Sequence, residues 1–221
     1  IDFYTNAVYK HPEAEDAYFM MPAAYHHWES DDFPATMDVQ LLTSRDGITW
    51  NRMGDRQPFI RRGLEGTPSG GMVMANVWPV LTETETWIYY AGRGHKHNTS
   101  ERDGSNTGLF RAVLRRDGFV SADAGLSGGE FVTPPLEFDG TELELNVDCG
   151  GGGWLLIELQ DAGGRPFEDY TLQTCKTVTA NTITTRVSWK DVGHRITASG
   201  PVRLRVVMRS TKLYAFRFVA E

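Results

Sequence analysis

Four of the six histidines come in two close pairs, His26 with His27 and His95 with His97. An imidazole can both donate and accept a hydrogen bond, so several of them together suit a ligand rich in hydroxyl groups. The strand arrangement predicted below places amides, a guanidinium group and aromatic rings on the same rim as both pairs, and an aromatic face packs well against the apolar face of a sugar ring. The candidate ligand-binding residues are therefore Tyr4, Asn6, His26, His27, Asn76, Trp78, Arg93, His95 and His97.

The same histidines suggest two other interpretations. A His-x-His spacing on a strand, as in His95 and His97, puts two imidazoles on one face and could bind a metal ion. No carboxylate is clearly aligned with them, and the neighbours His26 and His27 would point apart on a strand, so we expect no metal and no cofactor. The alternative is that all these polar residues are ordinary solvated loop side chains, with Trp78 in the core.

Two further patterns have simpler structural explanations. Glu13, Glu15 and Asp16 lie where a hairpin is expected, and polar turn chemistry accounts for them better than a catalytic acidic group. The glycine run 150–153 is not followed by Lys-Ser or Lys-Thr, so it indicates a turn between strands and not a phosphate-binding loop.

An internal repeat of about 70 residues positions the candidate ligand-binding residues. With this offset Asn6 aligns with Asn76, and His27 aligns with His97. Short runs rich in β-branched and aromatic residues alternate with turn signals, which indicates strands. The expected strands are 3–9, 17–25, 37–44 and 48–60 in the first copy, and 72–81, 86–93, 108–115 and 119–133 in the second. A repeated four-stranded antiparallel unit is typical of propeller blades.

In such a blade the first strand begins, and the second strand ends, at the same rim. Equivalent positions of neighbouring blades converge on the propeller axis. We therefore expect Asn6, His27, Asn76 and His97 to line one shared cavity, with Trp78 slightly deeper.

The pattern changes after residue 135. Alternation of apolar and polar residues, clear in 143–147 and 155–159, indicates strands with one buried and one solvated face. Several such strands with Gly-rich turns predict a β-sandwich. Trp154 and Trp189 are expected in its core, and two buried thiols are favoured over a bridge for Cys149 and Cys175. The predicted organisation is all-β: two propeller-type blades, 1–66 and 67–135, then a sandwich, 136–221.

Composition excludes some partners. The 221 residues have a net charge of −7 and a pI near 5.4, which argues against nucleic acid and anionic membranes as partners. No apolar run approaches the roughly 18 residues of a membrane span. The chain opens at Ile1 with no Met, directly on an expected strand, so we expect a processed or truncated N-terminus with any localisation signal upstream.

Several segments resemble one group of known proteins. These are Tyr4–Asn6 with Ala14–Pro22, the strand and turn Thr43–Trp50, and the C-terminal segments Arg116–Ser121, Asn146–Asp148, Val187–Lys190 and Leu204–Phe216. They resemble glycosyl-hydrolase-like five-bladed β-propeller proteins, related to glycoside hydrolase families 32 and 43, that have a C-terminal β-sandwich. By this resemblance the chain corresponds to the C-terminal part of such a protein.

The resemblance implies a carbohydrate-active protein, a glycoside hydrolase or the C-terminal portion of one, that acts on or binds glycans. The alternative is a non-catalytic carbohydrate-binding or interaction protein on the same scaffold. No position matches the Asn-Asp-Pro-Asn, Arg-Asp-Pro or Glu-Cys motif of family 32, so no catalytic residue is assigned, and the catalytic carboxylates are expected upstream. A signal peptide there would make the protein extracellular or periplasmic. Two blades cannot close a ring, so a homodimer through their exposed faces is also expected.

Overall fold

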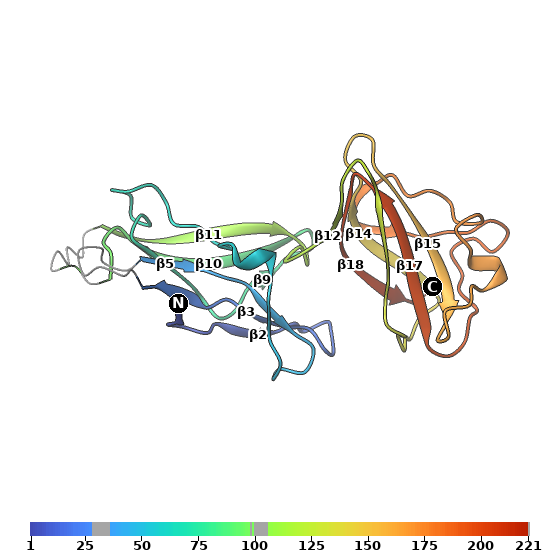
Figure 1. The fold of residues 1–221 in the computed structure, drawn as a ribbon, viewed down its shortest axis with the longest axis horizontal. Coiled ribbons are helices and arrows are strands. Elements are labelled where there is room, and N and C mark those ends of the chain that lie inside the picture. Colours follow the sequence, from blue (N-terminus) through green and yellow to red (C-terminus); the bar gives the residue numbers. More distant parts are fainter. Residues whose placement is uncertain (28–35, 98, 100–105, 221) are drawn as a thin grey trace. The chain divides into compact units, whose positions relative to one another are not determined.

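The protein consists of strands joined by turns. Figure 1 shows the computed structural model, which describes residues 1–27, 36–97, 99 and 106–220. Its described helices are two short 3-10 turns, η1 (Gly54–Arg56) and η2 (Glu168–Tyr170), and neither could span a membrane. The all-β prediction is confirmed. The chain divides into two compact units, unit 1 (Ile1–Leu114) and unit 2 (Arg115–Glu221).

The first repeat has strands within all four expected ranges, but three of the ranges hold two separate pieces, and the range 48–60 holds a strand of only two residues. The pieces are β1 (Asp2–Phe3), β2 (Val8–Lys10), β3 (Tyr18–Met20), β4 (Ala23–His26), β5 (Thr36–Val39), β6 (Leu42–Ser44) and β7 (Asn51–Arg52). Ala7, with a φ of 42°, separates β1 from β2, and Pro22 separates β3 from β4. As a result β2, β3, β6 and β7 form one antiparallel sheet, while β1, β4 and β5 enter another.

The second repeat extends that other sheet. Its strands are β8 (Met72–Ala75), β9 (Val80–Leu81), β10 (Glu85–Arg93) and β11 (Thr107–Arg115). The hydrogen-bonded order is β1-β4-β5-β8-β10-β11, with β9 on β10. One pair, β5 with β8, is parallel and meets at Met37 and Met72, which form a small core with Ala23. Strands β1, β4 and β5 of the first repeat thus lie in the same sheet as the strands of the second repeat.

The segment 119–133 does not form the fourth strand of the second blade. It contains β12 (Ala122–Ala124) and β13 (Gly129–Val132), which pair with β18 (Thr211–Val219) and β17 (Val202–Arg209) of unit 2. The reason is burial, because Ala122, Ala124 and Phe131 pack against the core of unit 2. Unit 1 therefore ends at Leu114 and not near residue 135.

Because the segment 119–133 pairs with strands of unit 2, β11 is the last strand of its sheet (Figure 1). Leu109 and Val113 on β11 are 76% and 45% exposed. Long strands at a sheet edge with exposed apolar side chains can pair with a second chain. The homodimer through exposed blade faces stays a prediction.

Unit 2 is a two-sheet sandwich. Its remaining strands are β14 (Glu142–Asp148), β15 (Trp154–Asp161) and β16 (Asn181–Arg186), in the sheets β12-β18-β14-β16 and β13-β17-β15. Leu145 of the first sheet and Ile157 and Val206 of the second are fully buried in one core, together with Trp189. Trp154 is only half-buried, unlike the core position expected for it.

Both cysteines lie in unit 2. Cys149 and Cys175 are buried free thiols, as favoured from the sequence. Burial raises the pKa of both, so they remain neutral near pH 7. They act as small core side chains.

The turn after β6 is built around one carboxylate. Asp46 Oδ1 accepts hydrogen bonds from the backbone N–H groups of Thr49 (2.7 Å) and Ile48 (2.8 Å) and from the Ser44 hydroxyl (2.9 Å). These three hydrogen bonds, of which that from Thr49 has the largest effect, hold the pKa of Asp46 far below its ordinary value. Gly47 follows with a φ of 73°, which favours glycine.

Replacing Asp46 by alanine is expected to lower the melting temperature by roughly 2–4 °C at neutral pH. A carboxyl group whose pKa is lower in the folded state stabilises the fold at pH values above its unfolded pKa of about 3.9. This stabilisation is lost as the pH falls toward the folded-state pKa. In thermal melts, the difference in melting temperature between the wild type and Asp46→Ala should therefore be constant from pH 7 to about 5 and become smaller below pH 4. Asp46→Asn, which keeps an acceptor oxygen, should show a smaller loss. A difference that stays constant down to pH 2 would contradict this account.

Candidate functional site

Four rings meet at one end of the large sheet of unit 1. Tyr25 is central, and its ring centroid lies 4.7 Å from that of His27, 5.1 Å from that of His97 and 6.3 Å from that of Tyr4. The Tyr4 and His97 centroids are 5.2 Å apart, and Tyr4 Oη and His97 Nε2 share a 3.4 Å hydrogen bond. We call Tyr4, Tyr25, His27 and His97 the ring cluster. It joins side chains from both repeats.

The pairing of β1 with β4 brings the rings of Tyr4, Tyr25 and His27 together. β1 pairs with β4 so that Asp2 is opposite Tyr25 and Phe3 is opposite Ala24. The Tyr4 N–H continues this pairing by donating to the Ala23 carbonyl at 2.9 Å. Since side chains alternate along a strand, Tyr4 and Asp2 lie on the same sheet face as Tyr25 and His27.

The second repeat supplies His97 through the connection after β10. β10 pairs with β8 so that Arg93 is opposite Met72, and the Gly71 N–H donates to the Arg93 carbonyl. Gly71 also lets the next turn approach closely, because a Cβ there would lie 2.0 Å from the His95 carbonyl oxygen. This close approach sets the path of the chain that leads to His97.

A carboxylate anchors one imidazole of the ring cluster. Asp2 Oδ2 lies 2.7 Å from His27 Nε2. The hydrogen bond from His27 is the main cause that lowers the pKa of Asp2, so this carboxylate is ionised at neutral pH. The pair is open to solvent, with side-chain exposures of 73% for Asp2 and 56% for His27. The arrangement offers a ligand an oriented imidazole beside aromatic faces.

His26 lies apart from the ring cluster. It precedes His27 on the same strand end, so its side chain points to the other face of the sheet, where its Nε2 lies 3.0 Å from Asp38 Oδ2. Both side chains are largely buried, at 28% and 14% exposed. The structure thus separates the two neighbouring histidines.

The two asparagines of the expected cavity do not take part in the ring cluster. Asn6 is exposed, and its carbonyl accepts the Met21 N–H. Asn76 pairs with Tyr89 and caps the Val77 N–H through its side-chain oxygen at 2.8 Å. The rim end of β8 is Met72, and four residues at about 3.4 Å each put Asn76 roughly 14 Å away along the strand.

Trp78 follows Asn76 and lies still further from the Met72 end of β8. It is 68% exposed, and its ring packs edge-on against Tyr9 with centroids 5.9 Å apart. Tyr9 in turn contacts Phe19 and His11 at the hairpin between β2 and β3. Trp78 is therefore neither a core residue nor part of the ring cluster.

Arg93 and His95 lie shortly before His97 in the sequence, but neither side chain belongs to the ring cluster. Arg93 is the exposed last residue of β10. His95 is half-buried, and its Nδ1 lies 3.1 Å from the Lys96 carbonyl oxygen. The backbone carbonyls of both residues lie against Gly71, at the start of the connection that ends in His97.

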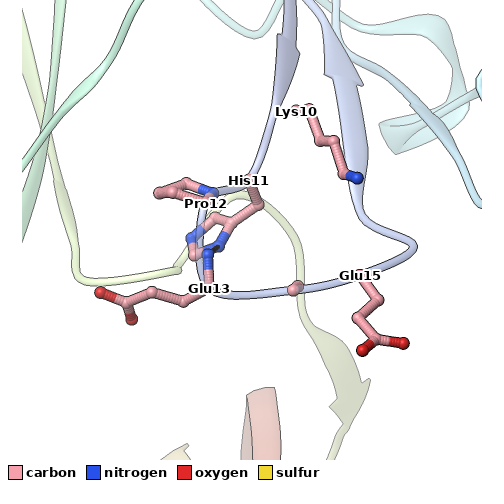
Figure 2. Close-up of a pocket in the computed structure, with 6 residues that line it drawn as sticks. Lys10, His11, Pro12, Glu13 and Glu15 are labelled. Carbon is pink, nitrogen blue, oxygen red and sulfur yellow. Dashed lines mark hydrogen bonds between the residues drawn. The ribbon is translucent and has the colours of Figure 1, made fainter.

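A shallow pocket of about 530 Å³ lies at the β2–β3 hairpin. Figure 2 shows that the carboxylates of Glu13 and Glu15, which line it, point away from one another. The Glu13 N–H donates to His11 Nδ1 at 3.2 Å. These residues form a turn, and the two carboxylates do not converge on a common point. Within the ranges that the structure describes, no group of three His, Cys, Asp or Glu side chains could hold a metal ion.

No family model and no curated protein matches the chain. A solved structure with some likeness to it is a glycoside hydrolase family 43 arabinoxylan arabinofuranohydrolase from Bacillus subtilis in complex with cellotetraose. The identity is 9% and the TM-score 0.28, and the match covers 98% of this chain and 54% of the other. The chain thus spans about half the length of that protein. At this TM-score the likeness carries no argument about the site.

The sequence did not single out Asp2 and Tyr25, although both belong with the site. A signal for each was present. Tyr25 stands two residues before His27, and Asp2 stands two residues before Tyr4, so each shares a strand face with a candidate residue. Alternation within the strand would have added both.

Proposed function

We propose that the chain is part of a carbohydrate-active protein and that the ring cluster is a glycan-binding site. The observation that supports this is the meeting of Tyr4, Tyr25, His27 and His97 from two repeats at one solvent-exposed place. Aromatic faces pack against the C–H faces of sugar rings, and imidazole and phenol groups bond to their hydroxyls. Tyr4 is 57% exposed, so part of the cluster is open to a ligand.

Binding without catalysis is the better-supported form of this function for the chain taken alone. Glycoside hydrolysis uses two carboxyl groups, one of which must donate a proton. Among the described residues, the carboxylate that bonds to the ring cluster is Asp2, whose lowered pKa keeps it ionised. Asp38 is paired with His26 on the other face of the sheet. Hydrolysis would need carboxyl groups from outside these residues.

The test is the binding of soluble glycans to the purified chain, measured by titration calorimetry after screening on a glycan array. His97→Ala and His27→Ala are each expected to weaken the binding about tenfold, which corresponds to the loss of about 1.4 kcal/mol. The double variant should lose the binding that the ring cluster contributes. Reducing-sugar release by the chain alone should stay at background.

His26→Ala is the matched control. It removes an imidazole from the same strand end but on the opposite face, so glycan affinity should stay within twofold of the wild type. Circular dichroism checks that all variants fold. If His27→Ala and His97→Ala bind the glycan as tightly as the wild type, the ring cluster is not the binding site.

A further inference from the structure

The outer face of the three-stranded sheet in unit 2 is open at one end. In β13-β17-β15, Trp154 is opposite Arg209, and Glu130 and Leu156 are both opposite Val207. Alternation points these side chains away from the core, because Leu155 and Met208 beside them are buried. A groove of about 460 Å³ lies here, lined by Trp154, Val207, Arg209, Glu130 and the turn around Leu126.

The same sheet face is closed at its other end. Glu158 and Gln160 also lie on the outer side of β15, yet they are only 4% and 8% exposed. Glu158 accepts the Leu172 N–H at 3.4 Å and the Gln160 side-chain amide at 2.9 Å. The chain around residue 172 therefore covers this end. At the Trp154 end, Leu126 is 78% exposed and Trp154 only half-buried.

The open end combines an aromatic ring with charged hydrogen-bonding groups. Among the described residues, none accepts a hydrogen bond from the Trp154 indole N–H, and none forms an ion pair with Arg209. Arg205, by contrast, already bonds to Glu130 at 2.8 Å. A ligand in the groove would meet the Trp154 ring, the guanidinium donors of Arg209 and the remaining acceptor capacity of Glu130.

We propose that this groove is a second glycan-binding site, in which a sugar ring stacks on Trp154 while Arg209 and Glu130 bond to its hydroxyl groups. Sugars match both halves of the lining, since they have an apolar C–H face and a polar rim. The charged side chains of Glu130 and Arg209 in the lining do not suit a purely apolar partner. The volume is also within the ordinary range for small-ligand sites.

The test is affinity electrophoresis of the whole chain in gels that contain arabinoxylan, hydroxyethylcellulose, galactomannan or polygalacturonate. These probes separate neutral sugars from uronates, and retardation in any of them identifies the preferred chemistry. To isolate the groove, the background is the His27→Ala, His97→Ala double variant. In that background Trp154→Ala is expected to lower the affinity at least tenfold, Arg209→Ala several-fold, and Trp154→Phe, which keeps a stacking ring, less than threefold.

Two results would overturn the proposal. One is that none of the four polysaccharides retards the double-variant background. The other is that Trp154→Ala, with the same circular dichroism spectrum as its parent, is retarded as strongly as that parent. Retardation of the wild type that the double variant loses entirely would support the ring cluster of unit 1 and reject the groove. The two proposals therefore fail separately.

Discussion

Gly153→Ala is expected to lower the free energy of unfolding of unit 2 by on the order of 4 kcal/mol. Gly153 is buried at the end of the turn between β14 and β15, and its N–H donates to the Cys149 carbonyl at 2.7 Å. A Cβ there would lie 2.0 Å from the Cys149 oxygen and 2.2 Å from the Ser210 oxygen. Cys149 directly follows β14, and Ser210 joins β17 to β18, so the clash falls on backbone at the ends of core strands and the turn must open. Urea denaturation measures the loss, and hydrogen exchange of residues 142–161 locates it.

Gly152→Ala is the matched control in the same turn. A Cβ at Gly152 meets nothing within 4 Å, and its φ is not in the left-handed region. This substitution should be neutral or stabilising by a few tenths of a kcal/mol, because alanine restricts the unfolded chain. Equal losses for both variants would contradict a specific close approach at Gly153, as would a wild-type stability for Gly153→Ala.

Trp189→Ala is expected to cost about 3–5 kcal/mol, the usual range for emptying a core of a large aromatic side chain. Trp189 is fully buried in unit 2, its ring meets Tyr170 edge-on with centroids 5.2 Å apart, and its N–H donates to the Ile157 carbonyl at 3.0 Å. Removal of the indole therefore leaves a cavity and takes away a buried hydrogen bond. Denaturant unfolding followed by circular dichroism gives the difference.

Trp154→Ala provides the comparison for Trp189→Ala within the same unit. The sequence expected both tryptophans in the core, but only Trp189 is fully buried. Trp154→Ala should therefore cost less than half as much as Trp189→Ala. Similar costs for the two variants would show that Trp154 is as important to the core as Trp189.

The candidate site could be predicted in part. The repeat aligned His27 with His97, and the structure brings both rings against Tyr25. The same alignment expected Asn76 beside them, but Asn76 lies at the far end of β8 because Met72 occupies the rim position of that strand. An offset between two repeats identifies equivalent positions, but the strand register decides how far each one lies from the rim.

The sequence by itself determined the all-β class, the approximate positions of most strands, the turn within Thr43–Trp50 and the alternation of faces within each strand. These features depend on neighbours a few residues apart, so the local pattern is enough. Only the tertiary structure decided that residues 122–132 join the sandwich, because β17 and β18 offer partners about 80 residues away along the chain. It also decided that Trp154 lies outside the core and that a Cβ at Gly153 would meet the Ser210 oxygen, since both depend on which distant strand lies alongside.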